Sequence, residues 1–156
     1  MLPDATPMDL RPVLVVEDSA DDFDTVVKAT TLANVHNLLI RCADADAALS
    51  LLARTPASSF AFMLLDYDLP GLDGLALLEH LRRDFSPADL PVVVFTTSIN
   101  PRDREAFCAA GASAFHVKSV QHADCLQTLR SIFAHWLNPA APRAGTAISA
   151  RTGQSA

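Results

Sequence analysis

Short uninterrupted apolar runs alternate along the chain with segments whose apolar residues have helical spacing. We expect strands at the apolar runs, which cover 12–16, 38–43, 60–65, 91–95 and 114–117. The intervening spacing predicts helices over 24–32, 44–54, 74–81 and 101–110, and a final helix that ends at 137. Strands that are apolar at every position, instead of at alternate positions, are typical of a parallel sheet covered on both faces.

This order of elements predicts an α/β fold, a doubly wound five-stranded parallel sheet with five helices. A closed barrel would need eight strand–helix units, and a chain of 156 residues is too short for it. We expect an N-terminal extension over 1–11, a single domain over 12–137 and a flexible C-terminal tail over 138–156.

The final predicted helix has the clearest apolar stripe. Its members are Cys125, Leu126, Leu129, Ile132, Phe133, Trp136 and Leu137. We expect a helix of this length to overhang the sheet and to expose Trp136 and Leu137, unless the tail folds back over them. Because exposed apolar patches usually mark interfaces, we expect a two-fold homodimer. Its interface would be the face made by the fourth helix, fifth strand and fifth helix, with the C-terminal extension crossing to the partner.

Composition and charge narrow the class of protein. Half of the residues are hydrophobic, which is enough for a core, and no run of about 18 apolar residues predicts a membrane span. The net charge is -6 and all 18 acids precede residue 125, which argues against a nucleic-acid-binding surface. No basic region followed by an apolar stretch marks a secretory signal. Three widely spaced cysteines favour buried free thiols in a cytoplasmic protein.

Polar residues follow four of the predicted strands. Glu17 and Asp18 end the first strand, Asp66 the third, Thr96 the fourth and Lys118 the fifth. Because the carboxyl ends of parallel strands lie at one edge, and neighbouring strands are about 4.8 Å apart, we expect these side chains to meet in one crevice. Each residue alone is better explained as a turn, a helix cap or a solvated side chain, and the prediction depends on their joint placement.

Three carboxylates in one crevice repel one another unless a cation binds between them. Oxygen ligands alone favour a hard cation, Mg²⁺ or Mn²⁺, that keeps several waters. A carboxylate such as Asp66 can accept a phosphoryl group as an acyl phosphate, while Lys118 and the Thr96 hydroxyl stabilise the phosphoryl oxygens. We assign Asp73 only a helix-capping role and none of the five histidines a catalytic role.

Four motifs in this order resemble the response-regulator receiver family of two-component signalling. They are VLVVEDS at 13–19, MLLDYDLPGLDG at 63–74, PVVVFTTS at 91–98 and FHVKS at 115–119. The resemblance covers 12–137 and implies a flavodoxin-like sheet of strand order 2-1-3-4-5. It also implies phosphoryl transfer from a sensor histidine kinase, with no true enzymatic activity.

The resemblance implies roles for the acids of the site. Asp66 is similar to the family's phosphoacceptor and Asp18 to a direct metal ligand. Glu17 corresponds to a partner that acts mainly through water. The backbone carbonyl of Tyr67 would complete the protein's ligands to Mg²⁺ or Mn²⁺.

The resemblance also implies roles in the conformational switch that follows phosphorylation and in the rate of dephosphorylation. Thr96 resembles the switch hydroxyl, Phe115 the aromatic switch residue and Lys118 the phosphate-pairing lysine. Asp68 and Ser98 match the two variable positions that tune dephosphorylation.

The chain departs from the family at one position, because Ser119 stands where a proline, often in a cis peptide, usually follows the lysine. A cis bond without proline costs about 3 kcal/mol, so the aim of Lys118 is left open by the resemblance. The EDSADDFD stretch and the TTS after the fourth strand resemble small single-domain regulators paired with bacterial phytochromes, which implies a kinase partner of that kind.

Two other classes compete with this interpretation. DYDLP resembles the nucleophile motif of haloacid-dehalogenase-like phosphohydrolases, but there the acid pair comes last, whereas here it comes first. A pseudo-receiver, an interaction module that is never phosphorylated, is supported only by Ser119.

Overall fold

The computed structural model describes residues 8–138, which form a parallel sheet between two layers of helices. The strands are β1 (Val13–Val16), β2 (Leu39–Cys42), β3 (Met63–Leu65), β4 (Val92–Thr96) and β5 (Ala114–Val117). The helices are α1 (Ala20–Leu32), α2 (Ala45–Arg54), α3 (Gly74–Leu81), α4 (Pro101–Ala109) and α5 (His122–Trp136), with a 3-10 turn, η1 (Ala57–Ser59). The strand order is β2-β1-β3-β4-β5, so the predicted flavodoxin-like fold is confirmed.

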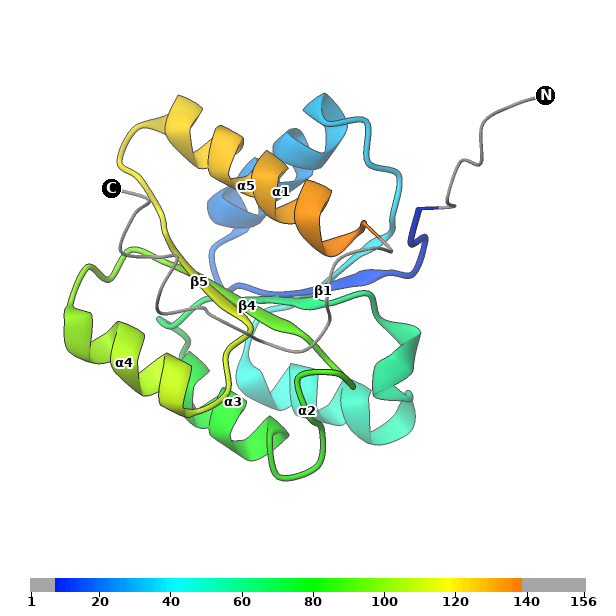
Figure 1. The fold of residues 1–156 in the computed structure, drawn as a ribbon, viewed down its shortest axis with the longest axis vertical. Helices are drawn as coiled ribbons and strands as arrows, with labels where there is room; N and C mark the ends of the chain where they lie inside the picture. The colour runs from blue at the N-terminus through cyan, green and yellow to red at the C-terminus, as the bar shows by residue number, and fades with distance from the viewer. Residues whose placement is uncertain (1–7, 139–156) are drawn as a thin grey trace.

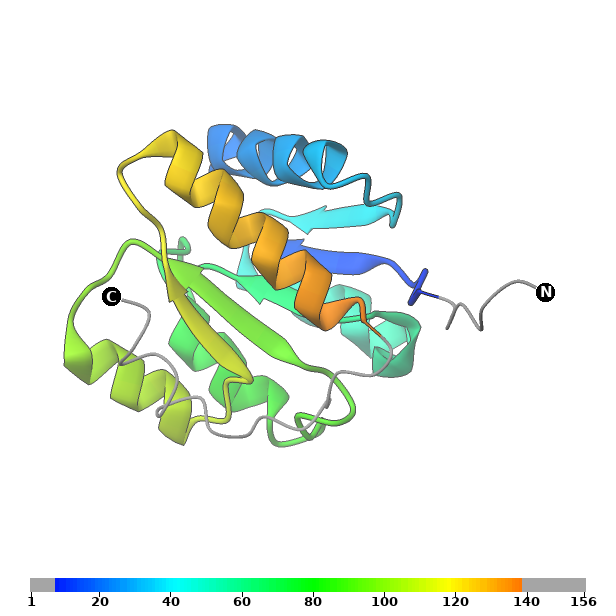
Figure 2. The ribbon, with the colours of Figure 1, turned by 45° about the horizontal axis from the view of Figure 1, so that its top comes forward.

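Helices α1 and α5 cover one face of the sheet, and α2, α3 and α4 cover the other (Figures 1 and 2). Successive strand residues face opposite layers, so both faces of each central strand need apolar side chains. In β1, Val13 and Val15 pack toward α1 and α5, whereas Leu14 and Val16 join the cluster beneath α2 and α3. This explains why the strands are continuously apolar in the sequence.

Two elements begin at other positions than the sequence predicts. Helix α1 begins at Ala20, not at 24, because the Ser19 hydroxyl accepts a hydrogen bond from the Asp22 N–H at 3.1 Å and caps the helix. Strand β3 begins at Met63, although the apolar run starts at Phe60. The segment before Met63 is buried and still runs beside β1, because the Ala61 N–H donates to the Pro12 carbonyl at 2.9 Å and the Phe62 carbonyl accepts from the Leu14 N–H at 3.1 Å.

The end of α5 lies against the domain, so the predicted overhang is wrong. Phe133 is fully buried and Leu137 is only 2% exposed, while Trp136 is half-buried. The ring of Phe62 packs edge-on against Phe133, with 5.4 Å between ring centroids, and the Asp9 N–H donates to the Leu137 carbonyl at 3.2 Å. Chain segments before β1 and β3 extend the packing surface beyond the strands, and the last turn of α5 covers it.

The cysteines carry no disulfide: Cys42 is buried, and Cys108 and Cys125 are half-buried free thiols. Within residues 8–138, no helix is long and apolar enough to cross a membrane. The predicted tail over 138–156 falls, after Asn138, outside the described residues.

Candidate phosphoryl-acceptor site

Three carboxylates meet at the carboxyl edge of β1 and β3. Oxygen atoms of Glu17, Asp18 and Asp66 all lie within 4.8 Å of one another, with Glu17 and Asp66 buried and Asp18 exposed. The two strand ends are held together by the Asp66 N–H, which donates to the Val16 carbonyl at 3.1 Å. Carboxylate oxygens at this spacing can bind one hard divalent cation between them.

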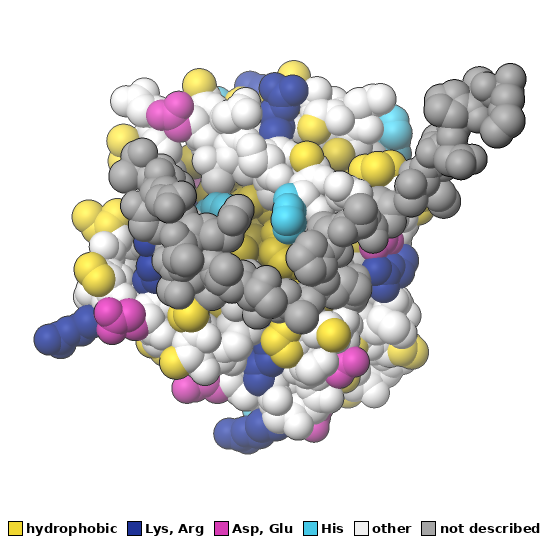
Figure 3. Space-filling model, viewed as in Figure 1, with side chains coloured by type: hydrophobic (Ala, Val, Ile, Leu, Met, Phe, Trp, Pro, Cys, Tyr) yellow, Lys and Arg dark blue, Asp and Glu magenta, His cyan; other side chains and the backbone are white. Residues whose placement is uncertain are grey.

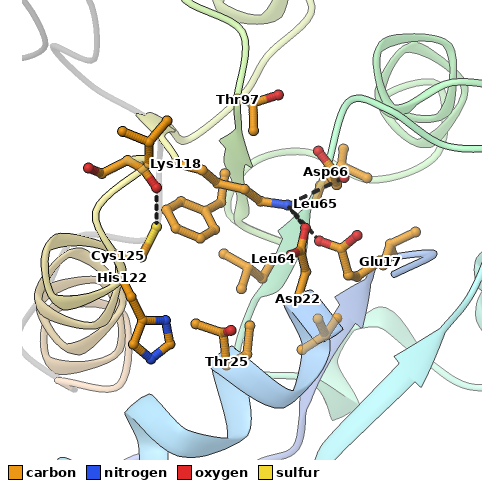
Figure 4. Close-up of a pocket in the computed structure, with 16 residues that line it drawn as sticks. Glu17, Asp22, Thr25, Leu64, Leu65, Asp66, Thr97, Lys118, His122 and Cys125 are labelled. Atoms are coloured by element: carbon orange, nitrogen blue, oxygen red, sulfur yellow. Dashed lines mark hydrogen bonds and ion pairs between the residues drawn. The ribbon is translucent and has the colours of Figure 1, made fainter. Parts of the chain in front are cut away.

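Lys118 reaches these acids from the end of β5, on the far side of β4. Its backbone N–H donates to the Thr96 carbonyl at 2.6 Å, which aligns the two strand ends. Its Nζ donates to Glu17 Oε1 at 2.8 Å and lies 3.5 Å from Asp66 Oδ2 (Figure 4). The Lys118–Ser119 peptide is trans, so this aim of the lysine is reached without the family's cis bond.

Asp22, in the first turn of α1, is a partner of Lys118 that sequence reasoning missed. Its Oδ2 accepts a hydrogen bond from Nζ at 2.9 Å. The apolar spacing predicts a helix that begins at residue 24, which leaves Asp22 in the preceding loop. The sequence feature that marks the true start of this helix is Ser19, a residue type that often caps helices. With Ser19 as the cap, Asp22 is the third residue of α1, and side chains there point back toward the end of β1.

The electrostatics of the site are those of a cation-binding pocket. Burial raises the pKa of Glu17 from 4.5 to about 7, with Lys118 opposing the shift and Asp66 adding to it. Burial likewise raises the pKa of Asp66, against the pull of Lys118. For Lys118, burial lowers the pKa, but the Glu17 hydrogen bond and the charge of Asp66 outweigh it and raise the pKa overall. The lysine is charged, while the two buried acids are costly to ionise together without a further cation.

A cavity of about 220 Å³ adjoins these charges on the α1 and α5 side of the sheet. Glu17, Asp66 and Lys118 form one end of it (Figure 4). Apolar side chains form the rest of its wall, among them Val26 and Phe95.

The protein-family comparison identifies this arrangement. A model of the response regulator receiver domain matches residues 13–130. The chain belongs to the response regulator receiver domain family. This match excludes the phosphohydrolase alternative, and the receiver domain is a phosphoacceptor signalling module, not a true enzyme.

Receivers of known sequence and structure match most of the chain. Response regulator Rcp1 of Synechocystis is 29% identical over 131 residues, which are 80% of this chain and 88% of Rcp1. The crystal structure of its Mn²⁺-bound form has a TM-score of 0.73 and 28% identity, covering 83% of this chain and 96% of that one.

Two further solved structures are phytochrome response regulators by name. The phosphorylated cyanobacterial phytochrome response regulator RcpA has a TM-score of 0.74 and 27% identity, covering 83% of this chain and 96% of that one. The bacteriophytochrome response regulator AtBRR has a TM-score of 0.58 and 30% identity, covering 80% of this chain and 94% of that one. The predicted similarity to phytochrome-associated single-domain regulators is confirmed.

In this receiver domain, Thr96 is fully buried at the end of β4. Its Oγ1 accepts a hydrogen bond from the Ser98 N–H at 3.3 Å, and the Ser98 hydroxyl donates to Asp103 in α4. The neighbouring Thr97, not Thr96, lines the cavity beside Lys118 (Figure 4). Thr96 therefore lies on the α4 side of the strand end, and Ser98 links it to that helix.

Phe115 of the receiver domain is 2% exposed and lies in the core beneath α4. Its ring is 5.7 Å from the ring of Phe107, and the Arg104 guanidinium lies 5.3 Å from its centroid on the outside. Phe107 in turn packs edge-on against Tyr67, with 5.3 Å between centroids. A row of aromatic rings thus runs from the residue after Asp66 to the α4 and β5 surface.

The loop after β3 fixes the backbone around Asp66. The Tyr67 carbonyl accepts hydrogen bonds from the Leu69 N–H at 3.0 Å and the Gly74 N–H at 2.9 Å. These two bonds fix the direction of the carbonyl within the loop, and its role as a metal ligand stays a prediction. The exposed Asp68 donates its N–H to Asp66 Oδ1 at 3.4 Å, which places its side chain at the rim of the site.

Gly74 is a further residue of the site that the sequence pattern does not mark. A Cβ at this position would lie 2.2 Å from the Asp66 carbonyl oxygen, so no other residue fits without moving the backbone of Asp66. Asp73 caps α3 as predicted, because its Oδ1 accepts a hydrogen bond from the Ala76 N–H at 2.9 Å.

Proposed function

We propose that this chain is a single-domain response regulator that accepts a phosphoryl group on Asp66 from a sensor histidine kinase. The observation that carries the proposal is the buried Asp66 carboxylate, which shares a three-acid cluster with Glu17 and Asp18 and lies 3.5 Å from Lys118. An Asp66 oxygen attacks the phosphorus, the phosphorus–nitrogen bond to the kinase histidine breaks, and the imidazole leaves with a proton.

The reaction needs a divalent cation, and we propose Mg²⁺ or Mn²⁺. Asp18, Asp66 and the Tyr67 backbone carbonyl would bind it directly and Glu17 through water, while further waters would fill the positions that the protein leaves open. The cation neutralises the acids and the incoming phosphoryl oxygens. The Mn²⁺-bound form of Rcp1 supports this donor set by analogy.

We assign Lys118 and Thr96 to the phosphoryl oxygens and Phe115 to the switch. Lys118 supplies a positive charge next to the acceptor, and Thr96 turns its hydroxyl toward the new phosphoryl group. The Phe115 ring already lies in the core beneath Arg104 before phosphorylation. Any movement of this ring on phosphorylation would therefore start from a buried position. Asp68 and Ser98, at the rim and in the loop after β4, would set how fast water removes the phosphoryl group.

The partner we propose is a bacteriophytochrome-type histidine kinase. We also propose that the chain acts in the cytoplasm. RcpA and AtBRR are phytochrome response regulators by name, and that likeness supports the assignment. The output would pass through the face formed by α4, β5 and α5, because Thr96 and Phe115 both lie behind it.

We also propose a two-fold homodimer through this α4, β5 and α5 face. Strand β5 is at the edge of the sheet, and His116 and Val117 are half-exposed between the two helices. Figure 3 shows hydrophobic side chains and histidines together on this side of the molecule. Arg102 and Glu105 are both exposed on α4, so a two-fold axis can pair opposite charges.

Sedimentation velocity at tens of micromolar tests the homodimer. Glu105→Arg should weaken it and Glu79→Arg, on the exposed side of α3, should not. A monomeric wild-type chain would refute it. A truncation before Asn138 that still dimerises would show that the tail is dispensable.

Labelling with a phosphorylated histidine kinase or acetyl phosphate tests the acceptor. We expect Mg²⁺-dependent labelling of the wild type and of Asp46→Asn, an exposed acid in α2, and none of Asp66→Asn. Undiminished labelling of Asp66→Asn would refute the acceptor. A wild-type chain that takes up no label with Mg²⁺ present would favour the pseudo-receiver instead.

A further inference from the structure

We propose that Asp22 competes with the phosphoryl group for Lys118 and so weakens the phosphorylated state of this receiver. The inference rests on the proposed function of Asp66 and Lys118. It adds a positioning residue on α1 that acts only through the lysine.

The competition follows from where the ammonium group lies, because a bond to a phosphoryl group on Asp66 needs Nζ closer to Asp66 than it is in this structure. Lys118 Nζ has three N–H groups, and in this structure it donates to Glu17 Oε1 at 2.8 Å and to Asp22 Oδ2 at 2.9 Å. The third acceptor, Asp66 Oδ2, is more distant at 3.5 Å. The lysine is therefore bound more closely by the two acids from β1 and α1 than by the acceptor (Figure 4).

Asp22 differs from Glu17 in what a metal ion would do to it. Glu17 belongs to the three-acid cluster, so a cation bound there would offset its charge. Asp22 is not a member of that cluster, so a cation there would leave its carboxylate beside Lys118. A phosphoryl group on Asp66 must then draw Nζ away from Asp22 or share it.

The position of Asp22 is fixed by the fold. Its N–H donates to the Ser19 hydroxyl at 3.1 Å, which holds the first turn of α1 against the end of β1. Its side chain is 47% exposed and that of Lys118 only 10%. Asp22 lines the same cavity as Asp66 and Lys118, so its carboxylate stays within reach of Nζ and acts on the site through the lysine.

Asp22→Asn tests the proposal, because the amide keeps the shape and one acceptor oxygen but removes the charge. The probe is beryllofluoride titrated into the full chain at saturating Mg²⁺, with binding followed by ¹⁹F NMR. We expect Asp22→Asn to bind it about two- to five-fold more tightly than the wild type, the range of a half-exposed ion pair. Equal or weaker binding would overturn the proposal.

Asp21→Asn is the matched control, because Asp21 is the exposed neighbour in the same helical turn and forms no ion pair with Lys118. Its affinity should equal that of the wild type, and the same gain in both variants would show a general charge effect and overturn the role of Lys118. In a Lys118→Met background, Asp22→Asn should have no effect. A wild-type chain that binds no beryllofluoride would overturn the proposed function itself, and with it this inference.

Discussion

Glu17 is buried, hydrogen-bonded to Lys118 and adjacent to Asp66, and its pKa of about 7 follows mainly from that burial. An acid whose pKa is higher in the folded than in the unfolded state binds its proton more tightly when folded. Its contribution to the free energy of unfolding is therefore fully present at low pH and falls as the pH rises from about 4.5 to about 7. A metal ion would reverse this loss by stabilising the ionised carboxylate.

We therefore predict that Mg²⁺ binds more tightly at pH 8 than at pH 6, because at the lower pH it must displace the proton of Glu17. Isothermal titration calorimetry at both values measures the difference. Glu17→Gln should bind more weakly and lose most of the pH dependence in this window. A wild-type affinity that does not change between these pH values would contradict the raised pKa.

Arg82 carries a structural role at the opposite edge of the sheet. Its Nε donates to the Gly111 carbonyl at 2.9 Å, and its Nη1 to the carbonyls of Phe85 at 3.2 Å and Leu90 at 2.9 Å. Burial lowers its pKa to about 10, which still leaves it charged. The side chain ties the end of α3 to the turns that precede β4 and β5.

Arg82→Ala should lower the free energy of unfolding by about 2–4 kcal/mol, because several partly buried carbonyls lose their donor. Urea denaturation followed by circular dichroism measures it. Arg83→Ala, at the exposed next position, should change stability by less than about 0.5 kcal/mol. Equal effects of the two substitutions would refute the role of Arg82.

The residues that sequence reasoning found and missed differ in one physical respect. Asp66 and Lys118 end apolar strands, so the parallel sheet alone brings them to one edge. Asp22 and Arg82 have partners that depend on helix starts and on backbone carbonyls of distant turns. The Ser19 cap marks where α1 begins, but a one-dimensional pattern does not encode the partners of these two side chains.

At the scale of elements, α3 determines the position of the acceptor as much as β3 does. Gly74, the first residue of α3, lies against the backbone of Asp66 and Tyr67. Its N–H also donates to the Tyr67 carbonyl. The helix start and the strand end are therefore one packed unit.

We predict that Gly74→Ala displaces Asp66 and weakens Mg²⁺ binding by at least ten-fold, besides costing about 1–3 kcal/mol of stability from overpacking. Asp73→Ala is the control, because it removes the cap of the same helix at a cost of about 1 kcal/mol without a clash. Calorimetry with Mg²⁺ separates the two. Similar loss of metal affinity in both variants would mean that α3 stability, and not the close approach, is responsible.

The sequence predicts which segments are helices and which are strands, but it predicts less well the residues at which they begin and end. All five strands and five helices follow from period and length, but α1 begins at Ala20 because of a side-chain cap. Whether the end of α5 is exposed or packed depends on Phe62, because its ring contacts Phe133 although the two residues are far apart in the chain. Tertiary contacts of this kind override local expectations at element ends.

At the scale of the whole molecule, the aromatic row of Tyr67, Phe107 and Phe115 connects the acceptor loop with the α4 and β5 surface. Packed rings transmit a displacement because they have little free volume. Arg104 covers the outer end of the row. A phosphoryl group on Asp66 would thus shift the position of α4 by two routes, one through the ring of Tyr67 and one through Thr96.

We predict that beryllofluoride changes amide hydrogen exchange in α4 and β5, and that Phe107→Leu reduces this response while leaving beryllofluoride affinity within about two-fold of wild type. The smaller side chain opens a gap in the aromatic row and should cost about 1–2 kcal/mol of stability. Phe62→Leu, in the cluster beneath α5, should cost as much but keep the response. An unaltered response in Phe107→Leu would refute the coupling.

The strand order has a consequence for protein synthesis. Glu17 and Lys118 are 101 residues apart in sequence, and the acceptor between them is completed only when β1, β3 and β5 share one sheet. A nascent chain that has not yet emerged past Lys118, or a molecule that has lost β5, lacks the assembled site. Phosphoryl uptake would therefore select molecules that are complete and folded, so that truncated or misfolded copies stay outside the signalling pool.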